Sequence, residues 1–233
     1  MNVLPPQSDN ELFDAYTRVL QTSKVSQQNL TQIEKDIKRT FSAQNYFNDS
    51  ENRKGYMRLQ RLLQAISCYK DIGYVQGMNY IAASLLWHCE EDISYYIMMS
   101  LYESLEAYKN YTDNLSGIQC HVDEFYSQYL KYNCNEIYEN LEEKDIIPQM
   151  LFPEWFVTLG TSIIPLRHHA LIFYNLIKHG WYYLYNILQN YLRFLYPYFQ
   201  NEDFGCTLLI IKNGKFEDGQ LIDIDWERIL GPG

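Results

Sequence analysis

The spacing of apolar residues predicts that most of this chain is helical. Over residues 57–69, apolar side chains recur at positions i, i+3, i+4 and i+7, which places Leu59, Leu62, Leu63 and Ile66 on one helix face. Comparable helical patterns cover residues 11–20, 30–37, 78–87, 90–105, 122–132, 135–141, 150–159, 166–179 and 181–199. The connections between them are short, so the sequence indicates an all-α protein.

Capping and breaking residues predict where several helices begin and end. Asn29 is suited to cap the helix over 30–37, because its side chain can accept a hydrogen bond from the first turn. Gly180 is expected to stop one long helix, and Pro197 is expected to end the next.

The C-terminal tail admits two interpretations. Residues 207–217 contain Asn213-Gly214, a common signal for a β-hairpin turn. The apolar run before this dipeptide could equally close a helix. A short hairpin near the C-terminus therefore remains an open alternative. Asp223 and Asp225 lack the glycine and glutamate of a calcium loop, so we expect them to be helix caps.

Composition excludes several functional classes. The 233 residues carry a net charge of −10, which argues against a protein that binds nucleic acid or anionic lipid. The most apolar run, 181–199, is interrupted by polar residues and is too short to span a membrane. Five scattered cysteines without a CxxC motif suggest reduced thiols in the cytoplasm, and the five histidines lack the spacing of a metal site.

Charge is unevenly distributed along the chain. Residues 35–61 contain seven basic and three acidic side chains, a local balance of +4 within an acidic protein. This window is either a solvated helix face or a positive field for one anionic ligand.

Two short segments carry the candidate chemistry. Arg39 lies at the edge of a polar loop, and Gln76 lies between Gly73 and Gly77 just before a helix. Arginine and glutamine form no nucleophile, metal site or acid–base pair, but together they could neutralise phosphate charge and position a water molecule. The structural alternatives are a salt bridge from Arg39 to Asp36, three residues earlier, and an ordinary interhelical turn at the glycines.

These segments resemble the signatures of the TBC-domain family of Rab GTPase-activating proteins. Its I-x-x-D-x-x-R-T signature is matched by Ile33, Asp36, Arg39 and Thr40. Its G-Y-x-Q-G-M-N signature is matched by Gly73, Tyr74, Gln76, Gly77, Met78 and Asn79. A third family segment, W-F-x-T-L, is matched from Trp155 to Leu159. The resemblance covers roughly residues 30–190.

The resemblance implies one two-lobed helical domain over 1–233, with the catalytic loops in a lobe of about 1–120 and a second lobe of about 121–233. It implies that Arg39 stabilises charge on the γ-phosphoryl group of a GTP-bound Rab-type GTPase while Gln76 orients the attacking water. Asp36, Thr40, Tyr74, Gly73, Gly77, Met78 and Asn79 would support these two residues. The partner would carry the GTP and magnesium, so the chain needs no cofactor of its own. We expect it to be cytoplasmic, peripheral to endomembranes through its Rab partner, and to act in vesicle trafficking.

Two departures from the family pattern keep other functions open. Ser42 replaces a usual proline, and residues 171–174 (Leu-Ile-Phe-Tyr) replace an R-x-W-D stretch. A Rab-binding module with little or no catalysis is therefore an alternative to an activating protein. A purely structural helical scaffold is another. For catalysis, we expect Arg39 and Gln76 to come from separate loops and to meet over a shared hollow that another protein's nucleotide can enter.

Overall fold

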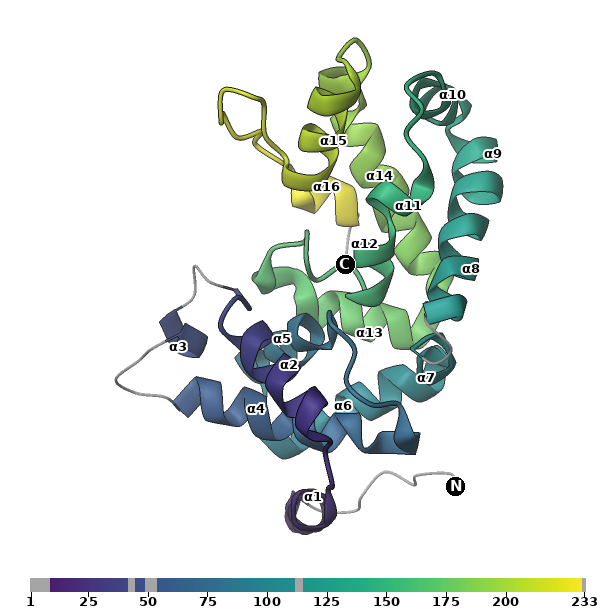
Figure 1. Ribbon diagram of the computed structural model, residues 1–233. Helices are drawn as coiled ribbons and strands as arrows, with labels where there is room; N and C mark the ends of the chain where they lie inside the picture. The colour runs from purple at the N-terminus through teal and green to yellow at the C-terminus, as the bar shows by residue number, and fades with distance from the viewer. Residues whose placement is uncertain (1–8, 42–44, 49–53, 112–114, 232–233) are drawn as a thin grey trace. The chain divides into compact units, whose positions relative to one another are not determined.

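The computed structural model describes residues 9–41, 45–48, 54–111 and 115–231, and Figure 1 shows that they are almost entirely helical. No regular β-strand occurs in these ranges; one isolated antiparallel bridge joins Lys215 and Leu221. The all-α prediction is therefore confirmed. The chain divides into two compact units, Met1–Tyr108 and Lys109–Gly233, whereas the boundary expected near residue 120 falls inside a helix.

Unit 1 is built around a central helix, α4. Its helices are α1 (Asp9–Thr22), α2 (Gln27–Ile37), α3 (Asn45–Asn48), α4 (Lys54–Ser67), the 3₁₀ turn η1 (Tyr69–Asp71), α5 (Met78–His88), α6 (Glu91–Ser104) and the start of α7 (Ala107–Asn110). α4 contacts α1, α2, α3, α5 and α6. The predicted apolar face of α4 is completely buried, so its periodicity is what gathers the other helices around it.

Unit 2 is organised along its longest helix, α14 (Trp181–Phe199). Its other elements are α8 (Ser116–Glu124), the π-helical segment η3 (Phe125–Leu130), α9 (Lys131–Asn133), α10 (Asn135–Glu143), α11 (Pro148–Leu151), α12 (Pro153–Val157), η4 (Leu166–His168), α13 (His169–His179), α15 (Phe204–Asn213) and α16 (Trp226–Leu230). α14 contacts α10, α13, α15, α16 and η3 (Figure 1). No helix among the described residues combines the length and hydrophobicity needed to cross a bilayer.

Two predicted helix boundaries are wrong. α2 begins earlier than expected, because Ser26 rather than Asn29 is the N-cap and its hydroxyl accepts a hydrogen bond from the Asn29 backbone N–H at 3.2 Å. α14 continues through Pro197 to Phe199. Proline removes only one backbone hydrogen bond there, and the complete burial of Leu195 and Phe199 on either side favours the continued helix.

The hairpin with Asn213-Gly214 as its turn is wrong, whereas a short antiparallel turn lies just beyond it and is closed by the bridge between Lys215 and Leu221. α15 runs to Asn213, and Gly214 ends it in the left-handed conformation with φ +60°. The Gly214 N–H donates to the Ile210 carbonyl oxygen at 2.9 Å, as in a helix C-cap. Asn-Gly therefore serves as a helix stop, because the same positive φ suits both structures. Asp225 does cap α16, by accepting a hydrogen bond from the Arg228 N–H at 3.0 Å.

We predict that Gly55→Ala destabilises unit 1 by about 1–3 kcal/mol, the usual cost of overpacking. A Cβ atom at Gly55 would lie 2.1 Å from the Tyr46 carbonyl oxygen, so α3 and α4 would have to separate. The matched control is Gly205→Ala in α15, where the nearest atom would be at an ordinary 3.6 Å. Urea unfolding of both variants measures the effect; equal stability of the two would contradict the close approach.

Candidate functional site

Arg39 follows directly after α2, in a tight turn on the surface of unit 1. The Arg39 N–H donates to the Asp36 carbonyl oxygen and the Thr40 N–H to that of Ile37, each at 3.1 Å. This turn closes the helix and leaves the Arg39 side chain 53% exposed. Arg39 is therefore accessible to a partner protein.

Gln76 lies in the segment between two glycines that precedes α5. Gly73 and Gly77 have φ values of +74° and +112°, conformations that side chains other than glycine rarely adopt. They break the helical path, and Gly77 becomes the N-cap residue of α5. Gln76 is exposed, and its amide makes no hydrogen bond to any part of the chain that the structure describes.

The carboxylate of Asp36 connects the two segments. Asp36 is completely buried, and its Oδ1 accepts hydrogen bonds from Arg39 Nη2 at 2.7 Å and Gln32 Nε2 at 3.0 Å. Its Oδ2 accepts one from the Tyr74 hydroxyl at 2.8 Å. A buried carboxylate is tolerated only when its charge is compensated in this way, so the three donors become fixed relative to one another.

A second set of hydrogen bonds, through Thr40 and Asn79, links the same two segments. The Thr40 hydroxyl donates to the Asp36 carbonyl oxygen at 2.7 Å, and Asn79 Nδ2 donates to Thr40 Oγ1 at 2.8 Å. Asn79 Oδ1 accepts from the Gly77 N–H at 2.9 Å and lies 3.2 Å from the Tyr74 hydroxyl. The neighbours of Arg39 are thus bonded to the neighbours of Gln76, and the two signatures form one surface site.

The supporting residues have different physical roles. Thr40 and Asn79 are buried connectors, and buried Met78 accepts a hydrogen bond from the Val75 N–H through Sδ at 3.4 Å. Burial, followed by the hydrogen bond to Asp36, raises the pKa of Tyr74 far above its usual range and keeps its hydroxyl protonated as a donor.

The salt bridge considered as a structural alternative is present, but it engages one side of the guanidinium. Arg39 bonds to Asp36 through Nη2 alone. Its Nε and Nη1 make no hydrogen bond within the described ranges. Since guanidinium carries five N–H donors, Arg39 can bind an anion while remaining attached to Asp36.

The positive window expected over 35–61 is largely neutralised. Arg58 bonds to Glu90 at 2.7 Å and lies 3.7 Å from Glu91, which also pairs with Arg61. These carboxylates come from the start of α6, which the sequence places thirty residues away. Lys35, Lys38, Lys54 and Arg39 remain exposed, and Arg39 is paired with Asp36; Arg53 and Ser42 lie outside the described residues.

The hollow expected over Arg39 and Gln76 stays a prediction. A cavity of about 560 Å³ in unit 1 is lined by residues including Tyr46, Arg58 and Trp87, but not by Arg39 or Gln76. Both side chains are exposed, so a protein partner could reach them. No group of three or more histidine, cysteine or acidic side chains in the described ranges could hold a metal ion.

Sequence reasoning missed two parts of this site. Gln32 precedes Asp36 by four residues, so the i, i+4 rule could have identified it as a donor. The bond between Thr40 and Asn79 joins residues 39 positions apart, and no local pattern indicates it.

We predict that Tyr74→Phe lowers the free energy of unfolding by about 1.5–3 kcal/mol, the usual value of a hydrogen bond to a charged group. The change removes one donor from buried Asp36 and leaves the ring in place. Tyr132→Phe is the matched control, because Tyr132 is 83% exposed. Chemical denaturation gives both values; equal, near-zero losses would show that the bond contributes nothing.

We also predict a pH dependence that this variant changes. The raised pKa of Tyr74 means that above about pH 10 the unfolded chain loses this proton while the native protein keeps it. The contribution is fully present below pH 10 and is lost as pH rises further. Burial and neighbouring glutamates raise the pKa of Tyr16 and Tyr126 as well. Wild type and the Tyr74→Phe variant therefore both lose stability above pH 10, and the variant loses less. Tyr74→Phe should flatten the stability curve between pH 10 and 11 by up to about 1.4 kcal/mol per pH unit. If the free energy of unfolding had the same slope against pH in both proteins, the raised pKa of Tyr74 would be contradicted.

Comparison with known proteins gives consistent matches. Mouse TBC1 domain family member 4 is 32% identical over 139 residues, which are 59% of this chain and 10% of that protein. The structure of the Ypt/Rab-GAP domain of Gyp1p superposes with a TM-score of 0.75 and 16% identity, covering 95% of this chain and 77% of that one. The TBC domain of a Chlamydomonas flagellar RabGAP gives 0.70 and 20%, covering 87% and 67%. At these identities the two structures establish a shared fold.

The matched stretch is a small part of the curated relatives, spanning 10–12% of the first three. The family assignment rests on a longer alignment, which extends over residues 4–197 and includes both signatures of the site. This chain belongs to the Rab-GTPase-TBC domain family.

Proposed function

We propose that the chain accelerates GTP hydrolysis on a GTP-bound Rab-type GTPase by supplying Arg39 and Gln76 in trans. The observation that carries the proposal is the hydrogen-bonded junction in which Asp36 binds both Arg39 and Tyr74. This junction bonds the residues beside Arg39 to the residues beside Gln76, and both the guanidinium and the carboxamide are exposed. Family membership supplies the partner class.

Each residue has the chemistry that its role requires. The guanidinium stays protonated at any physiological pH and can donate to two phosphate oxygens at once, which stabilises charge that develops on the γ-phosphoryl group. The carboxamide of Gln76 can donate and accept simultaneously, as is needed to orient an attacking water. Nucleotide and magnesium arrive with the partner, so the chain needs no cofactor of its own.

The bond to Asp36 leaves Arg39 able to contact a phosphate group. Asp36 holds one nitrogen of Arg39 and thereby limits the rotation of the side chain, while the remaining N–H groups stay available. Positioning of this kind lowers the entropy lost when the transition state forms. Exposed Lys35 and Lys38 add a local attraction for the phosphate-bearing face of the partner. Through that partner the chain would act in the cytoplasm at the surface of endomembranes.

A catalytically silent Rab-binding module is the second candidate. The observation that favours it is the replaced stretch in unit 2, where Phe173 is buried and Tyr174 is 62% exposed in α13. This stretch carries no charged residue, so partner recognition can differ from that of relatives while Arg39 and Gln76 are retained.

Single-turnover GTP hydrolysis on a panel of GTP-loaded Rab proteins distinguishes the two candidates. We expect wild type to accelerate at least one Rab. On that Rab, Arg39→Ala should lose about 10³-fold or more, and Gln76→Ala should lose most of the acceleration. Arg39→Lys should also fail, because a point charge lacks the bidentate fork.

Arg18→Ala is the matched control, since Arg18 is an exposed arginine on α1 of the same unit. It should leave the rate unchanged. Binding of a Rab with no change in hydrolysis, or full activity of Arg39→Lys, would favour the silent module and overturn the catalytic assignment.

A further inference from the structure

A small pocket in unit 2 gathers two of that unit's three arginines. Arg193 on α14 and Arg228 on α16 line a cavity of about 200 Å³, together with Asn190, Phe194 and Ile229. Residues 109–233 contain nine basic and sixteen acidic side chains, a balance of −7. Both arginines are exposed, so solvent screens their mutual repulsion, and together they make this pocket a locally positive site in an acidic unit.

The side chain of Arg193 is held in place by neutral groups. Its Nε donates to Cys134 Sγ at 2.9 Å, and its Nη2 donates to the Asn133 carbonyl oxygen at 2.8 Å. These bonds orient the guanidinium but neutralise none of its charge. No carboxylate in the described part of the chain lies within 4.0 Å of either pocket arginine.

In the described part of the chain, the acidic neighbours of Arg228 form no ion pair with its side chain. Asp225 accepts the backbone N–H of Arg228 as a helix cap, and a Glu227 carboxylate oxygen lies 3.9 Å from His168 Nε2. Asn190 Nδ2 donates to the Ile229 carbonyl oxygen at 3.0 Å, which fixes α16 against α14. The two cationic groups therefore share a pocket whose walls are already fixed.

We propose that this pocket binds the phosphate group of a small soluble phosphate monoester. A guanidinium matches phosphate oxygens through its N–H donors, the pocket offers two guanidiniums, and Phe194 and Ile229 give an apolar wall for the organic part. At about 30 Å³ per water molecule, the cavity holds roughly the volume of six or seven waters, which suits one anionic group and a few attached atoms. The surrounding charge of −7 opposes an anionic membrane or nucleic acid. This site is separate from Arg39 and does not depend on the proposed GTPase function.

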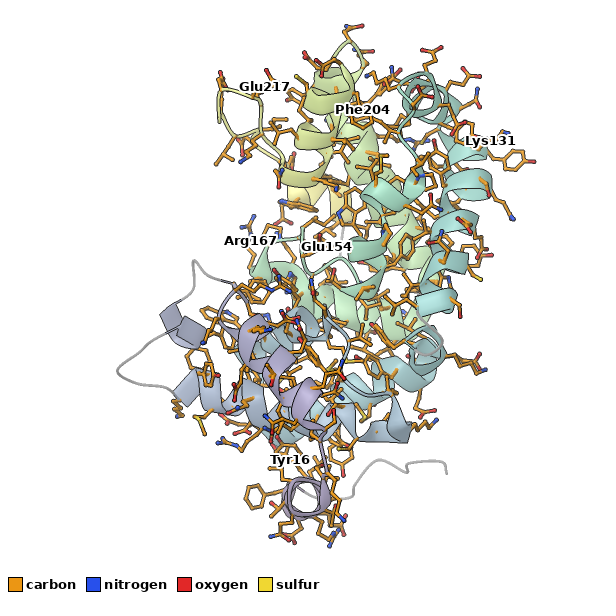
Figure 2. All side chains as sticks on the ribbon, in the orientation of Figure 1. Tyr16, Lys131, Glu154, Arg167, Phe204 and Glu217 are labelled. Atoms are coloured by element: carbon orange, nitrogen blue, oxygen red, sulfur yellow. The ribbon has the colours of Figure 1, made fainter. Side chains whose placement is uncertain are left out.

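The test is a titration of the full chain with glycerol phosphate and with inorganic phosphate, followed by ³¹P NMR and calorimetry at constant ionic strength. We expect saturable binding by wild type. Arg193→Gln and Arg228→Gln should each weaken it about tenfold or more, the usual effect of losing a hydrogen bond to a charged group. Arg167→Gln is the matched control, because Arg167, labelled in Figure 2, is the third arginine of the unit. It lies on η4 and does not line the pocket. It should bind like wild type.

Arg228 is exposed and caps no helix through its side chain, so its variant is expected to fold even if Arg193→Gln does not. Far-UV circular dichroism and a thermal melt check each variant. Equal binding by all variants, or no saturable binding by folded wild type, would overturn the proposal. Arginine-dependent binding to vesicles containing phosphatidic acid, without binding of either soluble phosphate, would overturn the assignment to a soluble ligand.

Discussion

The buried carboxylate of Asp36 is the constraint on which the candidate catalytic site depends. A charge with no exposed surface must be compensated, and here the compensation comes from α2, from the turn after α2 and from the segment before α5. Satisfying one carboxylate thus joins two parts of the chain that are almost forty residues apart. Removing a partner would leave a buried charge unpaired, so the junction is maintained by the cost of breaking it.

This arrangement separates support from chemistry. Asp36, Thr40 and Asn79 are buried and bonded to one another, while Arg39 and Gln76 are exposed at the edge of the junction. A rigid support with two exposed polar groups needs no cavity of its own, since the partner's nucleotide would provide the reacting atoms. The local charge is modest, because Glu90 and Glu91 neutralise two of the nearby arginines. If the proposed function holds, unit 1 contributes precise placement of the two side chains more than a broad positive field.

Sequence patterns predicted the helices well where apolar residues recur at regular helical spacing. The apolar face of α4 and the almost complete burial of α5 follow from spacing alone. Helix boundaries were less predictable. Serine and asparagine are both good N-caps, so the sequence alone did not select Ser26 as the start of α2. Asn-Gly suits both a hairpin and a helix stop, so it did not select Gly214 as the end of α15. The roles of Arg39 and Gln76 remain predictions. The pairing of Arg58 and Arg61 could not be predicted, because their partners come from a helix thirty residues away.

In the proposed function, one junction places Arg39 and Gln76 on the reacting phosphate of a partner. The most direct measurement is a structure of the chain bound to a responsive Rab that carries GDP and aluminium fluoride. The account predicts that Arg39 N–H groups and the Gln76 carboxamide lie within hydrogen-bond distance of the fluoride and the attacking water, with the bond from Tyr74 to Asp36 intact. A complex in which the Rab's own glutamine holds that water, while Arg39 contacts only Asp36, would contradict it.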